Sequence, residues 1–327
     1  MADGWPAAAP AAAESTRPAT GPVLEADCAS CFGLCCVAPA FFRSSEFAVD
    51  KPAGTPCLHL VGNACSIHDE LRPRGFPGCT AYDCFGAGQV VAQRTYQGTS
   101  WRAAPATAPQ MFRVFAVMRG LHELLWLLSE ALALESSTPV RAALSTAVGA
   151  TTALTESPAA ALDGLELDRV RDQVVPLLRE AGALARAGVP GPHHELAGAD
   201  LSGQDLRGLD LRGADLRGAV LLGVDLRAAD LHLADVTGAD LRGADLRRAD
   251  LGSTLFLTRV QVAGARGDHL TLLPTTLRRP AHWPADGAHE AGTTDASTRT
   301  GSLTGRTQTV RLGGAPGSKT HDEGTTA

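Results

Sequence analysis

Eight cysteines lie close together near the start of the chain, and none occurs after residue 84. They are Cys28, Cys31, Cys35, Cys36, Cys57, Cys65, Cys79 and Cys84. Two cysteines separated by two residues, as at Cys28 and Cys31, can turn both thiolates onto one metal ion. Eight thiolates are enough for two tetrahedral zinc sites, or for an iron–sulfur cluster with cysteines to spare. The spacing therefore predicts a metal-binding segment with zinc or iron as its cofactor.

Residues 25–100 have the composition of a small, loop-rich metal domain. Glycine and proline are frequent and apolar residues are few, so such a domain would take most of its fold from metal–ligand bonds. A disulfide framework and unrelated structural thiols are the alternatives. His68 is a further candidate, either as an extra ligand or as a hydrogen-bond donor to one, although His59 and His68 also suit ordinary loop positions.

The start of the chain, residues 1–24, lacks a basic region followed by an apolar run, so we expect a disordered lead and not a secretion signal. No later stretch supplies the roughly 18 uninterrupted apolar residues of a membrane span. We therefore expect a cytoplasmic protein, whose thiols stay reduced. The formal net charge of -6 argues against general binding to nucleic acids or to anionic membranes.

The order of the cysteines is similar to that of a known family. The stretches "CASCFGLCC", "CLHL", "CSIHDELRPRGFPGC" and "YDC" resemble the YkgJ-like cysteine-cluster domains, which are described as zinc- or iron-chelating. The other matching positions are Leu60, Ile67, Arg72 and Pro73. The resemblance implies that all eight cysteines are metal ligands. Two departures, an extra residue before Cys35 and His68 in place of a frequent tyrosine, leave open which thiols share an ion.

From residue 199 to residue 253 the sequence repeats every five residues, with Leu or Val third in all eleven blocks and Asp second in ten. A period of five fits neither a helix nor a flat strand. Fixed periodicity is typical of a solenoid, whose units bury their apolar faces by stacking. The pattern resembles the pentapeptide-repeat family, whose fold is a right-handed quadrilateral β-helix. With the degraded blocks at either end, the resemblance covers residues 194–258 and implies that residues twenty apart stack in columns.

In these columns the central Leu would fill the axis, and the second position of each unit would face water. Val220 and Leu222 stand where an Asp and a polar residue are expected, so they predict a docking surface, with the column of Arg207, Arg227 and Arg247 beside it. These arginines also suit a solvated face of ion pairs. Ten Asp against seven Arg leave the repeats a net charge of only -3. A solenoid this short and this close to neutral is a poor mimic of DNA for a topoisomerase.

Apolar residues at steps of three and four between Met111 and Leu132 predict an amphipathic helix. Two further helical stretches, 139–155 and 167–187, would complete a small bundle, which we prefer to a coiled-coil dimer. The helical connector would then cover residues 107–190. On the first helix, Trp126 and His122 are expected to be packing and surface residues.

The segment after the repeats, residues 259–284, is expected to cap the open end of the solenoid. The apolar residues available for this cap are Leu270, Leu272, Leu273, Leu277 and Trp283. Residues 285–327 are poor in hydrophobic side chains and predict a disordered tail.

The sequence as a whole predicts a multi-domain α+β protein with a cysteine-rich metal domain, a helical connector and a capped β-helix. Nucleotide-binding and hydrolase motifs are absent, so catalysis could arise only at the metal cluster. We expect a non-catalytic metal-binding protein whose solenoid is a scaffold for a protein partner, without nucleic acid or membrane partners. The alternatives are an iron–sulfur redox enzyme or sensor and, less favoured, a DNA-mimicking regulator of a topoisomerase. The sequence leaves the partner and the oligomeric state open.

Overall fold

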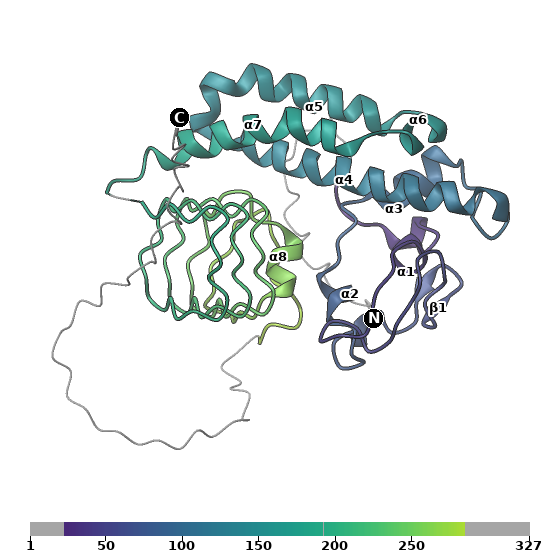
Figure 1. Cartoon of the computed structure of the whole chain (residues 1–327), viewed down its shortest axis with the longest axis horizontal. Coiled ribbons are helices and arrows are strands. Elements are labelled where there is room, and N and C mark those ends of the chain that lie inside the picture. The colour runs from purple at the N-terminus through teal and green to yellow at the C-terminus, as the bar shows by residue number, and fades with distance from the viewer. Residues whose placement is uncertain (1–22, 192, 285–327) are drawn as a thin grey trace, which may run out of the picture. The chain divides into compact units, whose positions relative to one another are not determined.

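The structure is a computed structural model and describes residues 23–191 and 193–284. The cysteine segment, a set of long helices and a coiled solenoid follow one another along the chain (Figure 1). The predicted lead and the predicted tail lie almost wholly outside the described residues. Leu24, however, was assigned to the lead and is only 3% exposed, because it packs into the same core as the solenoid. The assignment of Leu24 to a disordered lead is therefore wrong.

The cysteine segment is built from turns and short elements. A short hairpin pairs β1 with β2 in antiparallel register, with Leu60 opposite Cys65. Beyond it, a small core of Phe41, Leu71 and Phe76 holds the loops. The elements are η1 (Cys28–Ser30), α1 (Leu34–Val37), β1 (Leu60–Val61), β2 (Ala64–Cys65), η2 (His68–Glu70), α2 (Pro77–Ala81), α3 (Ala87–Gln89) and η3 (Val90–Thr95).

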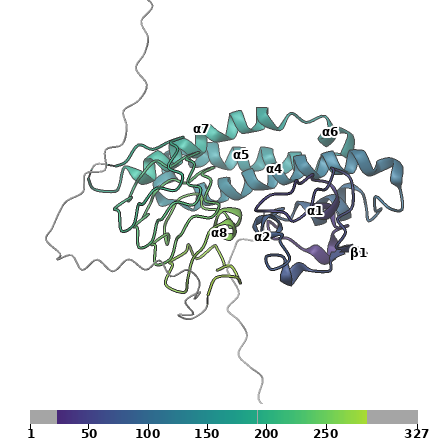
Figure 2. The same cartoon turned by 60° about the horizontal axis from the view of Figure 1, so that its bottom comes forward.

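The helical part consists of η4 (Pro105–Thr107), α4 (Ala108–Ala133), η5 (Glu135–Val140), α5 (Arg141–Thr155), α6 (Ala159–Asp163) and α7 (Leu167–Arg186). The helices α5 and α7 lie alongside α4, as Figure 2 shows from a second direction. Gly120 of α4 permits a close approach, because a Cβ there would lie 2.2 Å from the Leu167 side chain. Among the described residues, no helix is both long enough and apolar enough to cross a membrane.

The repeats form a β-helix in which parallel bridges join residues twenty apart, from Glu195 with Asp215 to Asp235 with Leu255. The amide of Leu201, for example, donates to the carbonyl of Val220 in the next coil at 2.8 Å. Four five-residue units therefore make one coil, as the stacking interval predicted. The central leucines fill the axis and leave almost no surface exposed.

The fifth position adopts a left-handed backbone conformation in every unit between residues 199 and 248. Gly203 has a φ of 66°, and the same region is occupied by non-glycine residues such as Leu233, with a φ of 54°. Glycine enters this region without the steric cost that a Cβ carries. The turn therefore favours the glycine that ends most units.

One side of the solenoid is covered by α7, which contradicts the expectation that every second-position residue faces water. Asp215 and Asp235 are only 2% and 1% exposed. Arg186 of α7 lies 3.4 Å from the carboxylate of Asp215. At Gly182 of α7 a Cβ would lie 2.5 Å from the Asp235 carboxylate, so only glycine allows this approach. This side of the solenoid is therefore an internal contact surface.

Burial raises the pKa of Asp235, even though the amide and hydroxyl of Thr237 donate hydrogen bonds to its carboxylate. Because the folded-state pKa lies above the unfolded value, the folded state binds more protons and loses stability as the pH rises above about 4. Asp235→Asn keeps the acceptor oxygen and removes the buried charge. We expect it to stabilise the protein by about 1 kcal/mol at pH 7. Urea unfolding should show no such gain at pH 3.5, and an equal gain at both pH values would contradict this explanation.

The solenoid ends in a cap that differs in part from the predicted one. The helix α8 (Arg259–Gly264) begins with a capping box between Thr258 and Gln261. Trp283 is 4% exposed, and its indole N–H donates to the Ala265 carbonyl at 3.1 Å. Leu270 and Leu272 were expected in the cap but are 48% and 54% exposed. They stay exposed because the buried positions of the cap are filled from α8 and by residues such as Leu277 and Trp283.

Candidate metal centre

All eight cysteines are free thiols, and folding brings them into two electrostatically linked sets. We define the first set as Cys28, Cys31, Cys35 and Cys84, and the second set as Cys36, Cys57, Cys65 and Cys79. Burial and repulsion from Cys84 raise the pKa of Cys28, and burial and repulsion from Cys36, Cys57 and Cys65 raise the pKa of Cys79. Cys36 also acts on Cys28 and Cys35, so the two sets meet at this thiol. Adjacent residues in the sequence, Cys35 and Cys36, fall into different sets.

The first set is held between η1, α1 and the start of α3. The Asp27 carboxylate accepts hydrogen bonds from the amides of Ala29 and Ser30, at 3.0 and 3.3 Å, and so caps η1 where Cys28 begins it. On the other side, a Cβ at Gly88 would lie 2.8 Å from the Cys31 sulfur and 3.8 Å from the Cys84 sulfur. The backbone of α3 therefore approaches two thiols of the first set closely.

The thiols of the first set lie in surroundings that favour the protonated form. Burial, with repulsion from Cys84, raises the pKa of Cys28. Burial likewise raises the pKa of Cys31. The hydrogen bond to Cys36, together with burial, raises the pKa of Cys35. A bound cation would reverse this preference, because metals bind the thiolate.

The second set is assembled from α1, β2, α2 and the loop before β1. The amide of Cys57 donates to the carbonyl of Cys36 at 2.9 Å, which ties the loop to α1. Burial raises the pKa of Cys79 to about 12, and the other three thiols of the set contribute. Cys36 differs from them, because a hydrogen bond from Cys35 lowers its pKa to about 7 and the Lys51 ammonium favours its thiolate. This thiolate is therefore the most readily formed of the second set.

Lys51 is a buried cation beside the second set and was not identified from the sequence. It is 4% exposed, although lysine is rarely buried. Its ammonium group donates to the carbonyls of Val37, Pro39, Pro52 and Thr55 at 3.1, 2.5, 3.2 and 2.9 Å. These carbonyls fix the charge in place.

The donor types suit zinc or iron, but the sulfur atoms are not gathered around a common point. The sulfurs of Cys35 and Cys36, which belong to different sets, are 3.9 Å apart, so the two sets are in contact there. Across residues 23–191 and 193–284, no group of three or more Cys, His, Asp or Glu side chains is placed to hold an ion as it stands. Metal binding would therefore draw the thiols of each set closer together.

The described ring contacts of the two histidines of the segment are with residues other than cysteine. The His68 side chain is 69% exposed, and the described contact of its ring is with Asp69 at 3.6 Å. His59 packs edge-on against the ring of Phe76, with the centroids 5.2 Å apart. The role predicted for His68 as a ligand or donor stays a prediction.

The residues around Cys84 join the cysteine segment to the solenoid and to α4. One carboxylate oxygen of Asp83 accepts from the amide of Phe85 at 2.7 Å, and the other pairs with Arg259 of α8 at 2.5 Å, so the side chain is only 11% exposed. The guanidinium of Arg259 also lies over the rings of Phe85 and Trp126, at 5.5 and 4.9 Å from their centroids.

The packing of Phe85 also explains why His122 is not at the surface. His122 is fully buried, and its Nδ1 is hydrogen-bonded to the carbonyl of Phe85 at 2.7 Å. Burial lowers the pKa of His122, so its ring is neutral and donates this bond. The expectation of a surface histidine is therefore wrong, whereas Trp126 is a packing residue as expected.

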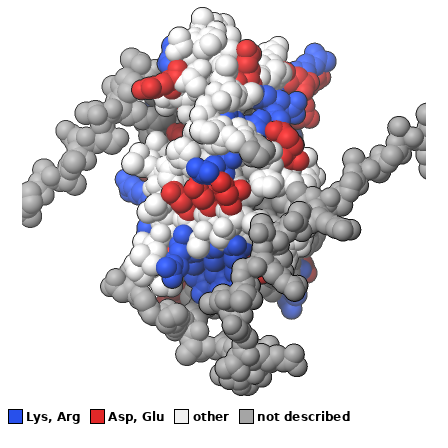
Figure 3. Space-filling view, turned by 90° about the vertical axis from the view of Figure 1, so that its left-hand side faces the viewer, with Lys and Arg blue, Asp and Glu red and all other residues white. Residues whose placement is uncertain are grey.

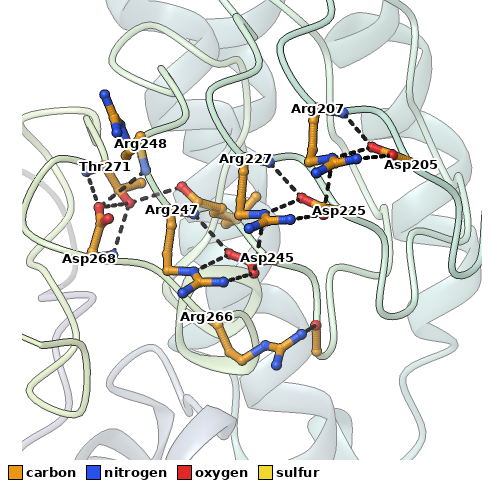
Figure 4. A network of polar contacts seen from close by, with 12 residues as sticks. Asp205, Arg207, Asp225, Arg227, Asp245, Arg247, Arg248, Arg266, Asp268 and Thr271 are labelled. Atoms are coloured by element: carbon orange, nitrogen blue, oxygen red, sulfur yellow. Dashed lines mark hydrogen bonds and ion pairs between the residues drawn. The ribbon is translucent and has the colours of Figure 1, made fainter. Parts of the chain in front are cut away.

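The predicted arginine column of the solenoid is a ladder of ion pairs (Figure 4). Arg207 donates to both carboxylate oxygens of Asp205, at 2.8 and 2.6 Å, and lies 3.5 Å from Asp225 of the next coil. Arg227 repeats the pattern with Asp225 and, at 3.8 Å, with Asp245. Charges of both signs also lie near one another on the side shown in Figure 3. This pairing leaves little of the unbalanced negative charge that a DNA mimic needs.

Val220 and Leu222, the apolar residues of the predicted docking surface, are half-buried. Larger apolar exposure occurs elsewhere in the described ranges. The large hydrophobic residues exposed there are Val23, Phe42, Leu58, Val61, Leu270 and Leu272. The docking surface at Val220 and Leu222 stays a prediction.

Comparison with known proteins agrees with the repeat architecture. The family model "Pentapeptide repeats" matches residues 195–232 and 229–254. The uncharacterized protein YybG of Bacillus subtilis (strain 168) is 54% identical over 264 residues, which are 80% of this chain and 95% of YybG. The chain belongs to the YybG family. Its repeats are also similar in sequence to those of solved structures.

Two solved pentapeptide repeat proteins are similar in sequence to part of this YybG-family chain. The pentapeptide repeat protein alr5209 from Nostoc Pcc 7120 is 32% identical, with a TM-score of 0.16, over 29% of this chain and 83% of its own. The pentapeptide repeat protein AT2G44920 from the Arabidopsis thaliana thylakoid lumen is also 32% identical, with a TM-score of 0.12, over 23% of this chain and 50% of its own.

Proposed function

We propose that this chain is a non-catalytic metal-binding protein of the cytoplasm, which holds zinc or iron at its eight cysteines and offers its solenoid to a protein partner. The observation that carries the proposal is that one small segment gathers eight free thiols, with Cys57, Cys65 and Cys79 packed against one core and Cys31 and Cys84 against another. Four sulfur ligands are what a closed structural zinc site uses. The resemblance to the zinc- or iron-chelating YkgJ-like domains supports the same function.

A bound ion would supply the cross-links that the cysteine segment otherwise lacks. Between α1 and α2 the buried apolar residues are only Phe41, Leu71 and Phe76. The second set has members before, between and after these residues, so an ion there would tie the loops together. Binding also releases the thiol protons, which explains how thiols with raised pKa values can serve as ligands.

The scaffold role follows from the pentapeptide repeats. Stacked coils present regular rows of side chains, and solenoids use such rows as extended binding surfaces. One side is covered by α7, so the partner would bind another, which includes the ion-pair ladder and the half-buried Val220 and Leu222.

Metal content of the chain purified without oxygen tests the proposal. We expect about two equivalents of zinc or iron per chain by elemental analysis, the number that two four-sulfur sites hold. The variant Cys28→Ser with Cys31→Ser and the variant Cys57→Ser with Cys65→Ser should each lose about one equivalent. His68→Ala is the matched control and should keep both.

Two outcomes of this experiment would change the conclusion. A brown protein with labile sulfide would favour the alternative of an iron–sulfur redox enzyme or sensor. Absence of stoichiometric metal from a folded protein would contradict metal binding at either set.

A further inference from the structure

The two cysteine sets lie in opposite electrostatic surroundings. Lys51 lies beside the second set, because its ammonium group is 5.2 Å from the centroid of the Phe41 ring, and Cys57, Cys65 and Cys79 pack against the core that contains Phe41. The same group donates to the carbonyl of Val37, the residue after Cys36. Burial lowers the pKa of Lys51, and negative charge at Cys57, Cys36 and Cys79 opposes this shift. The first set has an acidic neighbour instead, because the carboxylate of Asp27 caps η1 where Cys28 begins it. The other nearby carboxylate, that of Asp83, is paired with Arg259. This difference comes from fixed charges that the fold places beside the sulfurs.

Lys51 is held so firmly that its charge cannot turn away from the second set. Four backbone carbonyls surround its nitrogen, and together they exceed the three hydrogens that an ammonium group can donate. The planar guanidinium of arginine spreads its donors over a fork and does not match carbonyls that converge on one point. The chain has 29 Lys and Arg residues, of which only Lys51 and Lys319 are lysines. A lysine at this position therefore fits a geometric need.

The surrounding charge alters how strongly four thiolates hold a divalent ion. Such a complex carries a net charge of about -2, and a buried cation nearby stabilises it, whereas nearby carboxylates destabilise it. Exposure acts in the same direction. In the first set Cys28 and Cys35 are exposed, Cys84 is half-buried and Cys31 is buried, while the four thiols of the second set are half-buried. A competing ligand therefore reaches the first set more easily.

We propose that the two sets are unequal metal sites, with Lys51 making the second set a permanent site and the first set an exchangeable one. The proposal rests on the metal binding proposed above and adds the order in which the two sites fill and empty. The second set fills first and empties last. The first set delivers or accepts the ion, or senses its supply.

Zinc release from the full chain tests this order. The protein is loaded with two equivalents of zinc and mixed with an excess of 4-(2-pyridylazo)resorcinol, which reports each released ion. We expect a fast and a slow phase of about one equivalent each. Alkylation of free thiols at the end of the fast phase, followed by peptide mass spectrometry, should label Cys28, Cys31, Cys35 and Cys84 and leave the second set unlabelled.

Variants at the charged residues assign the cause. Lys51→Met removes the charge at similar length and should speed the slow phase by about tenfold or more, with the fast phase unchanged. Lys51→Arg keeps the charge but not the carbonyl geometry and should give an intermediate rate. Asp27→Asn keeps the cap of η1 and removes a repelling charge, so it should slow the fast phase several-fold. The Asp27→Asn variant and the labelling pattern still test the order of zinc release if Lys51→Met does not fold.

Several results would overturn the proposal. Release in a single phase, earlier labelling of the second set, or an unchanged slow phase in folded Lys51→Met would each show that the sites are equal or ordered otherwise. Failure to load any zinc would overturn both this proposal and the proposed metal binding, whereas two equal sites would leave metal binding intact.

Discussion

Removal of the metal is expected to unfold the part of the cysteine segment between residues 41 and 81, while the solenoid stays folded. That part has only Phe41, Leu71 and Phe76 as buried apolar residues, whereas an almost continuous apolar axis holds the solenoid together. A lobe with so little buried apolar surface depends on its ligand bonds for stability. The loops on either side of Phe41 should therefore lose their structure first.

Hydrogen exchange measured by mass spectrometry detects this local unfolding directly. In the chelated protein, peptides from residues 41–81 should exchange with little protection, and peptides from residues 199–255 should exchange as before. The short elements α1 and α3 should keep partial protection, because Leu34, Ala87 and Val91 pack in the core of α4. Adding the metal back should restore the protection of the peptides from residues 41–81. Unchanged protection of residues 41–81 after complete chelation would contradict a structural role for the metal.

Leu226→Ala is expected to destabilise the solenoid by about 2 to 5 kcal/mol, because it leaves a cavity in the axis. Leu226 is fully buried and lies one coil from Leu206 and from Leu246, so neither neighbour can easily fill the space. Leu222→Ala is the matched control. Its side chain is half-buried, and its loss should cost less than about 1 kcal/mol. The free energy of unfolding in urea gives both values, and equal losses would show that the axis is not the source of stability.

The fixed period predicted a stacked solenoid, and the resemblance to the pentapeptide-repeat family implied its four-sided coil. The covered side was not predictable, because burial of Asp215 and Asp235 depends on how α7 docks. The fourth position of each unit gives no signal of this burial, because Asp235 is followed by Thr237 whereas Asp215, which is equally buried, is followed by Arg217.

The cysteine spacing predicted a cluster but not its division. Cys35 and Cys36 are neighbours in the sequence and their sulfurs are in contact at 3.9 Å, so spacing alone does not tell which other thiols each of them joins. Cys84 comes last and joins the first set, because α3 returns to pack against η1. Lys51 carried one detectable signal, since lysine is rare in a chain that otherwise uses arginine. The burial of His122 depends on the docking of Phe85, which no local pattern reveals.

X-ray absorption at the metal edge of the intact protein, purified without oxygen, tests the central claim most directly. The account predicts about four sulfur neighbours per ion at about 2.3 Å, because only the cysteine sets supply that many sulfur ligands. A metal surrounded by oxygen and nitrogen, or no bound metal in a folded protein, would contradict it.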